Sequence, residues 1–415
     1  MTHEHNGKSE RQAQILEGVR VIDMTSVLFG SFSTQILGDL GADIIKIEGP
    51  GRKGGDILRY AGKPPVTKGM GPLFQHYNRN KRSVLLDASV PEDKAALLRL
   101  IETADMFISN VRMNGLARLG LDYESLKAVK SDLVYVHCTG YGADGPYASL
   151  QAYDDLIQAA SGATDLLPRL DGSEAPRYLP SMIADKSSGL FGAVAALAAL
   201  MHHQKTGEGQ FVEVPMLECF TYFNMTEHLY GHTFVPPTGP AAYSRVLNPN
   251  RRLFKTKDGY LAILPHADDT WDIFFEMAGM PPNSFTGDPR FQTGAQRKEH
   301  ISEIYEMIEN AALAHTADEW VRMLSERNVP CMKARHLDEV MEDPHLQATG
   351  FFMHRQHPTE GEYVSLRHPI RFDKTPATIR YDPPLPGEHT AEVLAEIGPQ
   401  SRDSAKRASS GRGDN

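Results

Sequence analysis

The sequence predicts an α/β protein of two domains, the larger built on a parallel sheet covered by helices. Short apolar strands alternate with helices over the first half of the chain, and such β-α-β units usually give parallel strands. The 415 residues are too many for one compact core. The composition also changes after about residue 235, where proline, asparagine and arginine become frequent.

The first β-α-β unit lies near the start of the chain. VRVIDM (19–24) is a short apolar strand, SFSTQILGDLG (31–41) has a cap-type serine, helical spacing and a final glycine, and ADIIKIE (42–48) is the second strand. The alternation continues with strands at 82–87, 105–110, 132–140 and 210–216, helices at 91–104, 153–162 and 185–207, and a further helix from about Leu217.

A smaller α+β domain is expected over residues 221–334. Its first part, VPPTGPAAYSRVLNPNRRLF, reads as loop, and DGYLAIL (258–264) reads as a strand after a turn. Three helical segments complete it: TWDIFFEMAGM, HISEIYEMIENAALAHT and ADEWVRMLSERN. The last fifteen residues are polar, which predicts a disordered tail over 401–415.

The bulk composition argues against several functional classes. Lys and Arg number 43 against 53 Asp and Glu, and the net charge of −10 disfavours nucleic acid while leaving room for a local basic pocket. The three cysteines (Cys138, Cys219 and Cys331) are far apart, which predicts neither a disulfide framework nor a zinc site. The N-terminus lacks the apolar core of a signal peptide, and the apolar run 189–201 is shorter than the ~20 residues that span a bilayer. A cytoplasmic protein without metal or membrane partner is expected.

Two glycine patterns match the dinucleotide fingerprint literally, GPGRKG (49–54) and GYGADG (140–145). Both follow predicted strands, but neither opens a helix that continues from the glycines, and the position after the first strand lacks the pattern. Classical dinucleotide binding is therefore disfavoured. Glycine loops that approach a substrate closely remain expected here.

Three polar clusters have an ordinary structural interpretation. His202 and His203 are neighbours on a helix and point about 100° apart, so they are expected at a solvated helix end. Asp154 and Asp155 are expected to cap their own helix. HYNRNKRS (76–83) gathers basic side chains before a strand, and a solvated edge and a phosphate clamp are equally consistent with it.

The stretch IADKSSGLFG (183–192) places Asp185 at the start of a long helix rich in small residues. The ordinary role of an aspartate there is capping. The helix is apolar on most faces, however, which predicts burial, and a buried carboxylate must be hydrogen-bonded or paired. At a helix N-terminus it is expected to stay ionised and accessible to a ligand near the strand ends. A cap and a reactive group both remain open.

Several segments in order resemble one family. They are LEGVRVIDMT, LGDLGADIIKIEGPG, NRNKRSVLLD, GYGADGPY, AYDDLIQAASG, IADKSSG, ALMHHQKTGEGQFVEVPM, NVPCMKARHLDEVMEDPHLQATGFF and PPLPGEHTAEVLAEIG. Over about residues 16–397 the chain resembles the class III CoA-transferases (CaiB/BaiF), which include formyl-CoA and carnitine CoA-transferases. The α-methylacyl-CoA racemases share this fold.

The resemblance implies a Rossmann-like large domain built from both chain ends (14–220 and 335–400), which binds CoA, and a smaller inserted domain (221–334). It also implies an interlocked homodimer. Asp185 falls on the family's catalytic carboxylate. It would form a mixed anhydride with the acyl group of an acyl-CoA and then an aspartyl-CoA thioester, which an incoming carboxylic acid resolves. The GYGADG turn is a candidate source of N–H donors for the tetrahedral intermediates.

For CoA, the co-substrate, the resemblance implies contacts after the first strand, at the end of a later strand, in the LARLGL segment, in the N-K-R-S segment and in the GYGADG turn. The residues are Ser26, Leu28, Phe29, Lys81, Arg82, Asn110, Arg118, Tyr141 and Gly142.

The sequence departs from its relatives at informative places. Leu28 and Phe29 replace the family's frequent Gln or Ala, and the glycine-only loop of formyl-CoA transferase is missing, which disfavours oxalate and formate as substrates. Arg245, Arg251 and Arg252 near that position could hold the far carboxylate of a dicarboxylic acid such as succinate, or could simply be solvated.

Two other functions stay open. Racemases of this fold pair the same aspartate with a histidine, and Tyr153 stands at that position, which favours a transferase because Cα proton exchange would lack its second acid–base group. A non-catalytic CoA-binding protein is the other alternative, and the presence of Asp185 argues against it.

Overall fold

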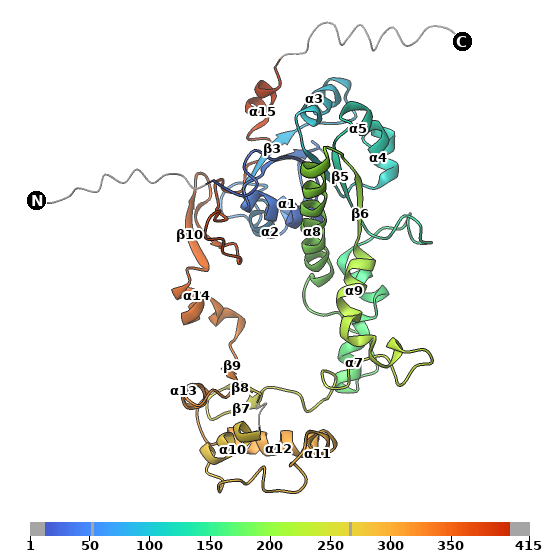
Figure 1. Cartoon of the computed structure of the whole chain (residues 1–415). Coiled ribbons are helices and arrows are strands. Elements are labelled where there is room, and N and C mark those ends of the chain that lie inside the picture. Colours follow the sequence, from blue (N-terminus) through green and yellow to red (C-terminus); the bar gives the residue numbers. More distant parts are fainter. Residues whose placement is uncertain (1–12, 51–53, 265–267, 399–415) are drawn as a thin grey trace, which may run out of the picture. The chain divides into compact units, whose positions relative to one another are not determined.

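A computed structural model describes residues 13–50, 54–264 and 268–398 (Figure 1). The predicted tail (401–415) lies outside the described residues. Within them the chain forms two compact units. The first comprises the residues up to Thr164, Tyr178–Asn224 and the residues from Ala348, and the second comprises Asp165–Arg177 and Met225–Gln347. The first unit thus contains both ends of the described chain, while 165–177 and 335–347 fall in the second.

Six parallel strands form the sheet of the first unit, in the order β3-β2-β1-β4-β5-β6. The strands are β1 (Arg20–Met24), β2 (Asp43–Glu48), β3 (Lys81–Leu85), β4 (Met106–Ser109), β5 (Val134–Thr139) and β6 (Phe211–Pro215). The strand order reverses between β1 and β4, which pair directly from Val21↔Met106 to Met24↔Ser109. In open parallel sheets a ligand binds beyond the carboxyl ends of the strands at such a reversal.

Helices cover both faces of this sheet. On one face α1 (Phe29–Asp39) packs against α8 (Ile183–Thr206), and α8 also contacts β5 and β6 (Figure 1). The opposite core includes side chains of α3 (Pro91–Glu102), α4 (Met113–Leu119), α5 (Tyr123–Val129) and α15 (Thr390–Glu396). The shorter helices of this unit include α2 (Pro72–Tyr77) and α6 (Asp154–Ala160).

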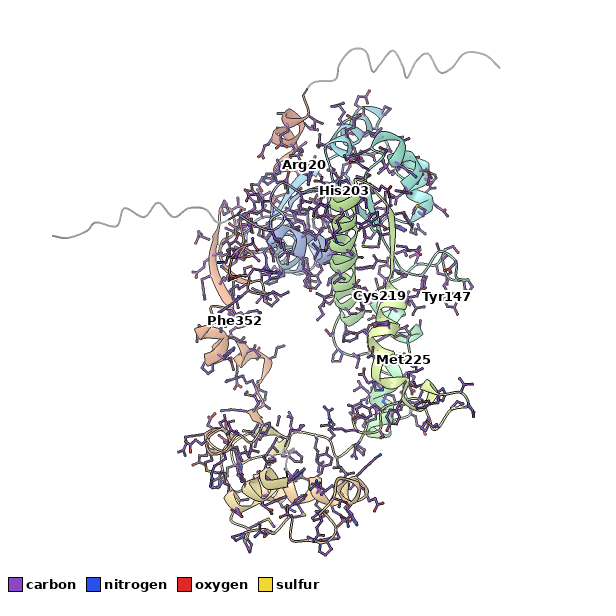
Figure 2. All side chains as sticks on the ribbon, in the orientation of Figure 1. Arg20, Tyr147, His203, Cys219, Met225 and Phe352 are labelled. Carbon is purple, nitrogen blue, oxygen red and sulfur yellow. The ribbon has the colours of Figure 1, made fainter. Side chains whose placement is uncertain are left out.

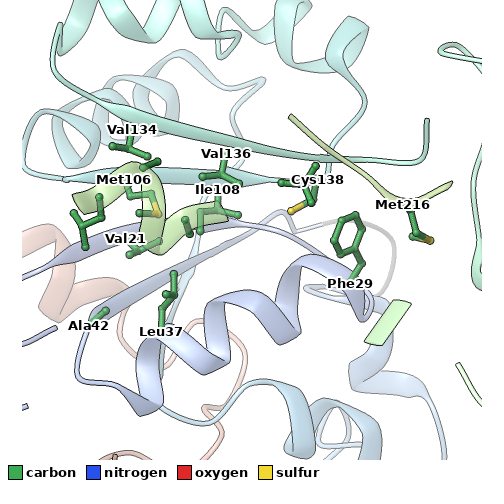
Figure 3. Packing of buried hydrophobic residues seen from close by; sticks show 14 of the residues in the cluster. Val21, Phe29, Leu37, Ala42, Met106, Ile108, Val134, Val136, Cys138 and Met216 are labelled. Atoms are coloured by element: carbon green, nitrogen blue, oxygen red, sulfur yellow. The ribbon is translucent and has the colours of Figure 1, made fainter. Parts of the chain in front are cut away.

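Successive strand residues supply the two cores because strand side chains alternate between faces. Val21, Ile44 and Val136 face α1 and α8, whereas Ile22, Ile45 and Tyr135 face the other layer. Figure 3 shows the first core, with Phe29 and Leu37 of α1 directed at the strands. Full burial of each large apolar side chain contributes about 1.5–3 kcal/mol, so both faces of the sheet hold the first unit together.

Small residues let α8 approach α1 closely. A Cβ atom on Gly192 would lie 2.4 Å from Ser33 Oγ, and one on Gly189 would lie 3.0 Å from the carbonyl oxygen of Phe29. The Ser33 hydroxyl donates a hydrogen bond to the Gly189 carbonyl (2.8 Å). The spacing of these glycines therefore seats the first turns of α8 against the beginning of α1.

By length and composition α8 could cross a membrane, since it has 24 residues. The apolar run noted in the sequence is shorter than the helix itself, so length does not decide the matter. More than half of the helix's apolar window is buried inside the protein, and its contacts with α1, α6, β5 and β6 are those of a core helix.

The HYNRNKRS segment joins the C-terminal part of the chain to the first unit. Arg79 forms a buried ion pair with Asp39 (2.6 Å) and donates to the Leu366 carbonyl. Asn80, at φ 59°, donates to Asp39 and the Thr378 carbonyl and accepts from the backbone of Arg380 and Tyr381. Asparagine adopts positive φ more readily than most residues. These bonds place 365–381 beside α1 and β3.

Among the described residues, the second unit has a three-stranded antiparallel sheet and several helices, including α7 (Leu166–Asp171). The strands are β7 (Phe254–Lys255), β8 (Tyr260–Ile263) and β9 (Cys331–Lys333), and the other helices include α10 (Asp268–Met277), α11 (Gly294–Glu299), α12 (Ile301–Ala312) and α13 (Ala317–Ser325). Its core is aromatic, with stacked Phe285 and Phe291 and a fully buried Trp320. Along the chain, β9 is followed by the 3₁₀ helix η4 (Leu337–Glu342) and by α14 (Pro344–Ala348).

Two further elements connect or extend the units. Helix α9 (Met216–His228) follows β6 and runs from the first unit into the second. The hairpin of β10 (Phe352–His357) and β11 (Gly361–Leu366) belongs to the first unit, and the sequence interpretation did not anticipate it.

Candidate active site

A cavity of about 1200 Å³ opens at the carboxyl ends of β1, β4 and β5. Its wall comes from the β1–α1 turn, the β4–α4 loop, the segment after β5 and the first turn of α8. In Figure 2, Arg20, the first residue of β1, and His203, in the last turn of α8, both lie at the amino edge of the sheet. Helix α8 therefore runs opposite to β1 and begins at the carboxyl edge. The strand-order reversal and the cavity therefore coincide, as expected for an open parallel sheet.

Asp185 lies in the cavity wall and is only 8% exposed. Its side chain does not cap α8, because the N-cap residue is Met182, which forms no side-chain cap bond. The backbone N–H of Asp185 donates instead to Asp154 Oδ2 (2.9 Å). Of the two interpretations open from the sequence, the capping role is wrong, and a buried carboxyl facing a cavity is what the structure shows.

Burial raises the pKa of Asp185 to about 7, and the negative charge of Asp154 acts in the same direction. A hydrogen bond from the backbone N–H of Phe29, the first residue of α1, opposes them and lowers the pKa. The sequence predicted that a helix N-terminus keeps this carboxylate ionised, and with a pKa of about 7 the carboxyl is ionised only in part at neutral pH. Loss of water and a second carboxylate outweigh the helix dipole here.

Asp154 was expected to cap its own helix, but its carboxylate instead accepts a hydrogen bond from the backbone of α8. The N-cap of α6 is Tyr153, without a side-chain cap bond. Asp154 Oδ1 accepts a hydrogen bond from Gln158 Nε2 (2.6 Å), and the same amide reaches the Ser181 carbonyl (3.1 Å). Gln158 Oε1 in turn accepts from the Leu179 N–H (2.9 Å). This network joins α6 to the segment before α8 and holds Asp154 beside Asp185.

The loops after β1 and β4 are bound to each other at the strand-order reversal. The Ser26 N–H donates to Asn110 Oδ1 (2.9 Å), and Asn110 Nδ2 donates to the Ser26 carbonyl (2.6 Å). Both residues line the cavity. The Asn110 amide is thus already engaged with backbone, so its first role is to fix the shape of the cavity wall.

Five of the nine residues expected to contact CoA come together in the cavity wall: Ser26, Phe29, Asn110, Arg118 and Tyr141. Leu28 is fully buried in the core instead. Gly142 is not in the wall, and its N–H donates to Glu218 Oε1 (2.9 Å). The neighbouring Ala143 N–H reaches Glu213 Oε1 at 3.2 Å. Two amides of the GYGADG turn are therefore bound to glutamate carboxylates, of which Glu218 is exposed.

Lys81 and Arg82 lie away from the cavity wall, in internal ion pairs. Lys81 is fully buried and pairs with Asp23 (3.1 Å). Arg82 pairs with Asp43 (2.7 Å), the first residue of β2, which is the amino edge of the sheet. Within the HYNRNKRS segment, Arg79 and Lys81 therefore lie in buried ion pairs, whereas Arg82 pairs with the partly exposed Asp43.

Several cavity residues were missed by the sequence interpretation, among them Arg112, His137 and Glu213. Arg112 follows the carboxyl end of β4, and this position was a usable signal. Neither Arg112 nor Arg118 forms an ion pair with any residue that the structure describes. His137 Nε2 donates to the Val111 carbonyl (3.1 Å), and burial lowers the pKa of this imidazole.

The three arginines considered for a dicarboxylate lie in the second unit. Arg245, Arg251 and Arg252 are exposed, and Arg252 pairs with Glu309. Elsewhere, the described ranges contain no group of three or more His, Cys, Asp or Glu side chains arranged to hold a metal ion. Figure 2 places Cys219 on α9 and Tyr147 on the loop that leaves the sheet after β5.

Comparison with known proteins places these features in one family. Residues 16–390 match the model of CoA-transferase family III. A succinate–glutarate CoA-transferase of Agrobacterium fabrum is 32% identical, over 92% of this chain and 95% of the relative. A formyl-CoA:oxalate CoA-transferase of Afipia carboxidovorans is 30% identical, over 93% and 94%. The crystal structure of a CaiB/BaiF family protein from Brucella suis superposes with a TM-score of 0.79 at 29% identity, over 93% and 100%.

The raised pKa of Asp185 predicts a pH-dependent stability. Its folded pKa of about 7 exceeds the ordinary 3.8, so the folded state loses stability as pH rises from the lower to the higher value. Asp185→Asn removes this loss. We expect the variant to melt several degrees above the wild type at pH 8, with the difference shrinking toward pH 4, in thermal unfolding followed by circular dichroism.

Asp155→Asn is the matched control because Asp155 adjoins Asp154 but is exposed. It should follow the wild-type melting temperature at both pH values. An Asp185→Asn variant that is less stable than the wild type at pH 8 would contradict the electrostatic picture.

Proposed function

Because the chain belongs to CoA-transferase family III, we propose that it transfers CoA from an acyl-CoA to a free carboxylic acid with Asp185 as the nucleophile. The enzyme class rests on the family match and on relatives named as CoA-transferases. The observation that carries the assignment to Asp185 is its position: a nearly buried carboxyl in the wall of the cavity at the strand-order reversal.

The shape and charge of the cavity suit an acyl-CoA. A volume of about 1200 Å³ exceeds the roughly 300–1,000 Å³ of ordinary small-molecule pockets, as a long co-substrate requires. Arg112 and Arg118 supply guanidinium groups on the β4–α4 side, and guanidinium groups match phosphate oxygens well. We propose that the phosphates lie near these arginines and that the thioester reaches toward Asp185.

The reaction would proceed through two covalent states on Asp185. The carboxylate attacks the thioester carbonyl, the carbon–sulfur bond breaks, and the CoA thiolate leaves a mixed anhydride. The thiolate then attacks the aspartyl carbonyl and releases the first acid, which gives an aspartyl-CoA thioester. The acceptor carboxylate attacks that thioester to form a second anhydride, and the thiolate takes the new acyl group and frees Asp185. No net proton is consumed, and each step is easier than direct exchange.

The backbone N–H of Phe29 is the group we propose for charge stabilisation in these steps. It lies in the first turn of α1, where backbone N–H groups lack helical partners, and it lowers the pKa of the Asp185 carboxyl. A donor already directed at this carboxyl is close to where oxyanion charge develops on the aspartyl carbon. It replaces the GYGADG turn as the favoured source, since the Gly142 and Ala143 amides are bound to glutamates.

Exclusion of water follows from the burial of Asp185. Its 8% exposure leaves little access for a competing water molecule. An anhydride intermediate needs this protection because water would hydrolyse it. Burial also sets the pKa of Asp185 to about 7, so a substantial fraction of the carboxyl is ionised at neutral pH. The same desolvation removes hydration from the nucleophile.

A dicarboxylic acid such as succinate is the substrate class we propose. Three of the relatives are named for succinate or succinyl-CoA with glutarate, from Agrobacterium fabrum, mouse and human. Racemisation is disfavoured because Tyr153, 59% exposed in the cavity wall, has a phenol in place of an imidazole.

A homodimer is proposed for the working enzyme. Helix α8 exposes an apolar row at helical spacing, Leu190, Val194 and Met201. Helix α9 of the same unit exposes Tyr222 and Phe223, and the Tyr222 ring contacts Phe191 of α8. Exposed apolar side chains that gather in this way mark an interaction surface. We also propose a cytoplasmic location, which fractionation of cells would check.

The nucleophile assignment predicts that Asp185→Ala abolishes transfer. Wild type and variant are compared with succinyl-CoA as donor and glutarate, formate, oxalate and acetate as acceptors, and product masses are measured. We expect transfer by the wild type to glutarate and at least about a 10³-fold loss in the variant, because no carboxylate remains to carry the acyl group. Residual transfer within about tenfold of wild type would refute the assignment.

The pKa of Asp185 predicts the pH profile of kcat/KM for the acyl-CoA. The carboxyl must be ionised to attack, so the rate should rise with pH, reach half its maximum near the Asp185 pKa of about 7, and level off above it. In Asp154→Asn the neighbouring negative charge is gone, so the midpoint should move to lower pH. The Asp155→Asn profile should match that of the wild type. An Asp154→Asn midpoint that stays or rises would contradict the proposed electrostatics.

The dimer proposal predicts that charge on the α8 row prevents association. Val194 is 64% exposed in the single chain, so Val194→Asp should fold yet sediment as a monomer. Lys205→Asp, on an exposed position of the last turn of the same helix, is the control and should retain the assembly. A dimeric Val194→Asp protein in analytical ultracentrifugation would show that this row is not the interface.

A further inference from the structure

The turn between β1 and α1 contains a strained residue that faces the cavity. Val27 has φ 62°, in the left-handed region, and it lines the cavity between Ser26 and Phe29. For a β-branched residue this conformation is a genuine outlier, because its Cβ crowds the backbone. Such strain persists only where the surroundings impose it, and it concentrates at functional sites.

Asp56 imposes the conformation of Val27. The Val27 N–H donates to Asp56 Oδ1 (3.1 Å), and the same oxygen accepts from the Leu58 N–H (3.0 Å). The other oxygen pairs with the fully buried Lys46 (3.0 Å). Asp56 itself is 4% exposed, and its own N–H is bound to Glu48 Oε1 (2.8 Å). The carboxylate is therefore fixed on both sides before it meets Val27.

Other side chains hold the rest of the turn. Lys46 Nζ donates to the Thr25 carbonyl (2.8 Å), and the Thr25 N–H donates to Asp23 Oδ1 (2.9 Å). Asn110 binds both backbone groups of Ser26. Three consecutive residues of the turn are thus bound by side chains from outside it. The residues before Val27 therefore cannot change conformation to relieve its backbone strain.

The turn ends at the residue whose amide meets Asp185. Phe29 lies two positions after Val27 and lines the same cavity wall as Asp185, and its backbone N–H lowers the pKa of that carboxyl. A rotation at Val27 would move this amide as well as the Ser26 segment of the cavity wall. We propose that Asp56 is a positioning residue, which keeps Val27 in its strained conformation so that the Phe29 amide stays on Asp185 and the turn fits the acyl-CoA. This inference rests on the proposed transferase function.

A double-mutant comparison tests the coupling between Asp56 and Val27. Glycine adopts positive φ without strain, so the turn of a Val27→Gly variant no longer needs the bond to Asp56. In the wild-type background, Asp56→Ala should lower kcat/KM by about tenfold or more, since small displacements at a reacting centre are costly. In the Val27→Gly background the same change should cost at most about threefold. Equal losses in both backgrounds would overturn the proposal.

The pH profile separates positioning from general destabilisation. Asp56→Ala should shift the kcat/KM midpoint to higher pH, because a displaced Phe29 amide no longer lowers the pKa of Asp185. Val27→Gly should cancel that shift. Asp39→Ala is the matched control, as it removes another buried aspartate, paired with Arg79 at 2.6 Å. Val27→Gly should not rescue Asp39→Ala, and a rescue there would make the effect nonspecific.

A second variant and hydrogen exchange test the positioning role of Asp56 if Asp56→Ala does not fold. If Asp56→Ala does not fold, Asp56→Asn replaces it; this variant keeps an oxygen for Val27 but loses the ion pair with Lys46, and a smaller loss, again suppressed by Val27→Gly, is expected. Amide hydrogen exchange over 25–29 needs no activity at all and should quicken in the Asp56 variant. A wild type that transfers CoA to no acid defeats the proposed function, whereas unchanged exchange in the variant defeats the positioning role.

Discussion

The close packing of α1 on α8 is the contact on which the site depends. Gly189 and Gly192 leave room for the backbone and Ser33 of α1, so that the first turns of the two helices meet at the carboxyl edge of the sheet. Because of this approach, the amide at the start of α1 reaches Asp185, and burial between the helices removes water from the carboxyl. Larger side chains at either glycine would separate the donor from the nucleophile.

Buried ion pairs stabilise the β1–α1 turn that leads into this contact. Lys46 and Lys81, both fully buried, neutralise Asp56 and Asp23 beneath the β1–α1 turn. Arg59 binds Glu48 on the flank of the same region. Breaking one partner of such a pair typically costs about 3–5 kcal/mol, because the other charge stays buried. The arrangement is therefore rigid, and a rigid support suits a reaction in which one carboxyl must meet two carbonyl carbons and a thiolate in turn.

The sequence predicted those features that depend on residues close together along the chain. Alternating apolar periods predicted the parallel strands, and the small-residue helix predicted the burial of Asp185. The partners of the charged side chains could not be predicted, since Asp154 lies 31 positions before Asp185, and Lys81 on β3 meets Asp23 on β1 across the intervening strand β2. The raised pKa of Asp185 could not be predicted for the same reason: the helix start was visible, whereas the second carboxylate came from a different helix. The strain at Val27 leaves no mark in a sequence, because it arises from Asp56 and Lys46 acting together.

The central claim is that Asp185 carries the acyl group and then CoA. The most direct measurement incubates the wild-type enzyme with succinyl-CoA and hydroxylamine and maps the modified residue by peptide mass spectrometry. Hydroxylamine cleaves an aspartyl anhydride or thioester and leaves a hydroxamate on the side chain. We predict a hydroxamate on Asp185 that depends on the acyl-CoA and occurs on no other acid. An unmodified Asp185 during active transfer, or a hydroxamate on Asp154, would contradict the claim.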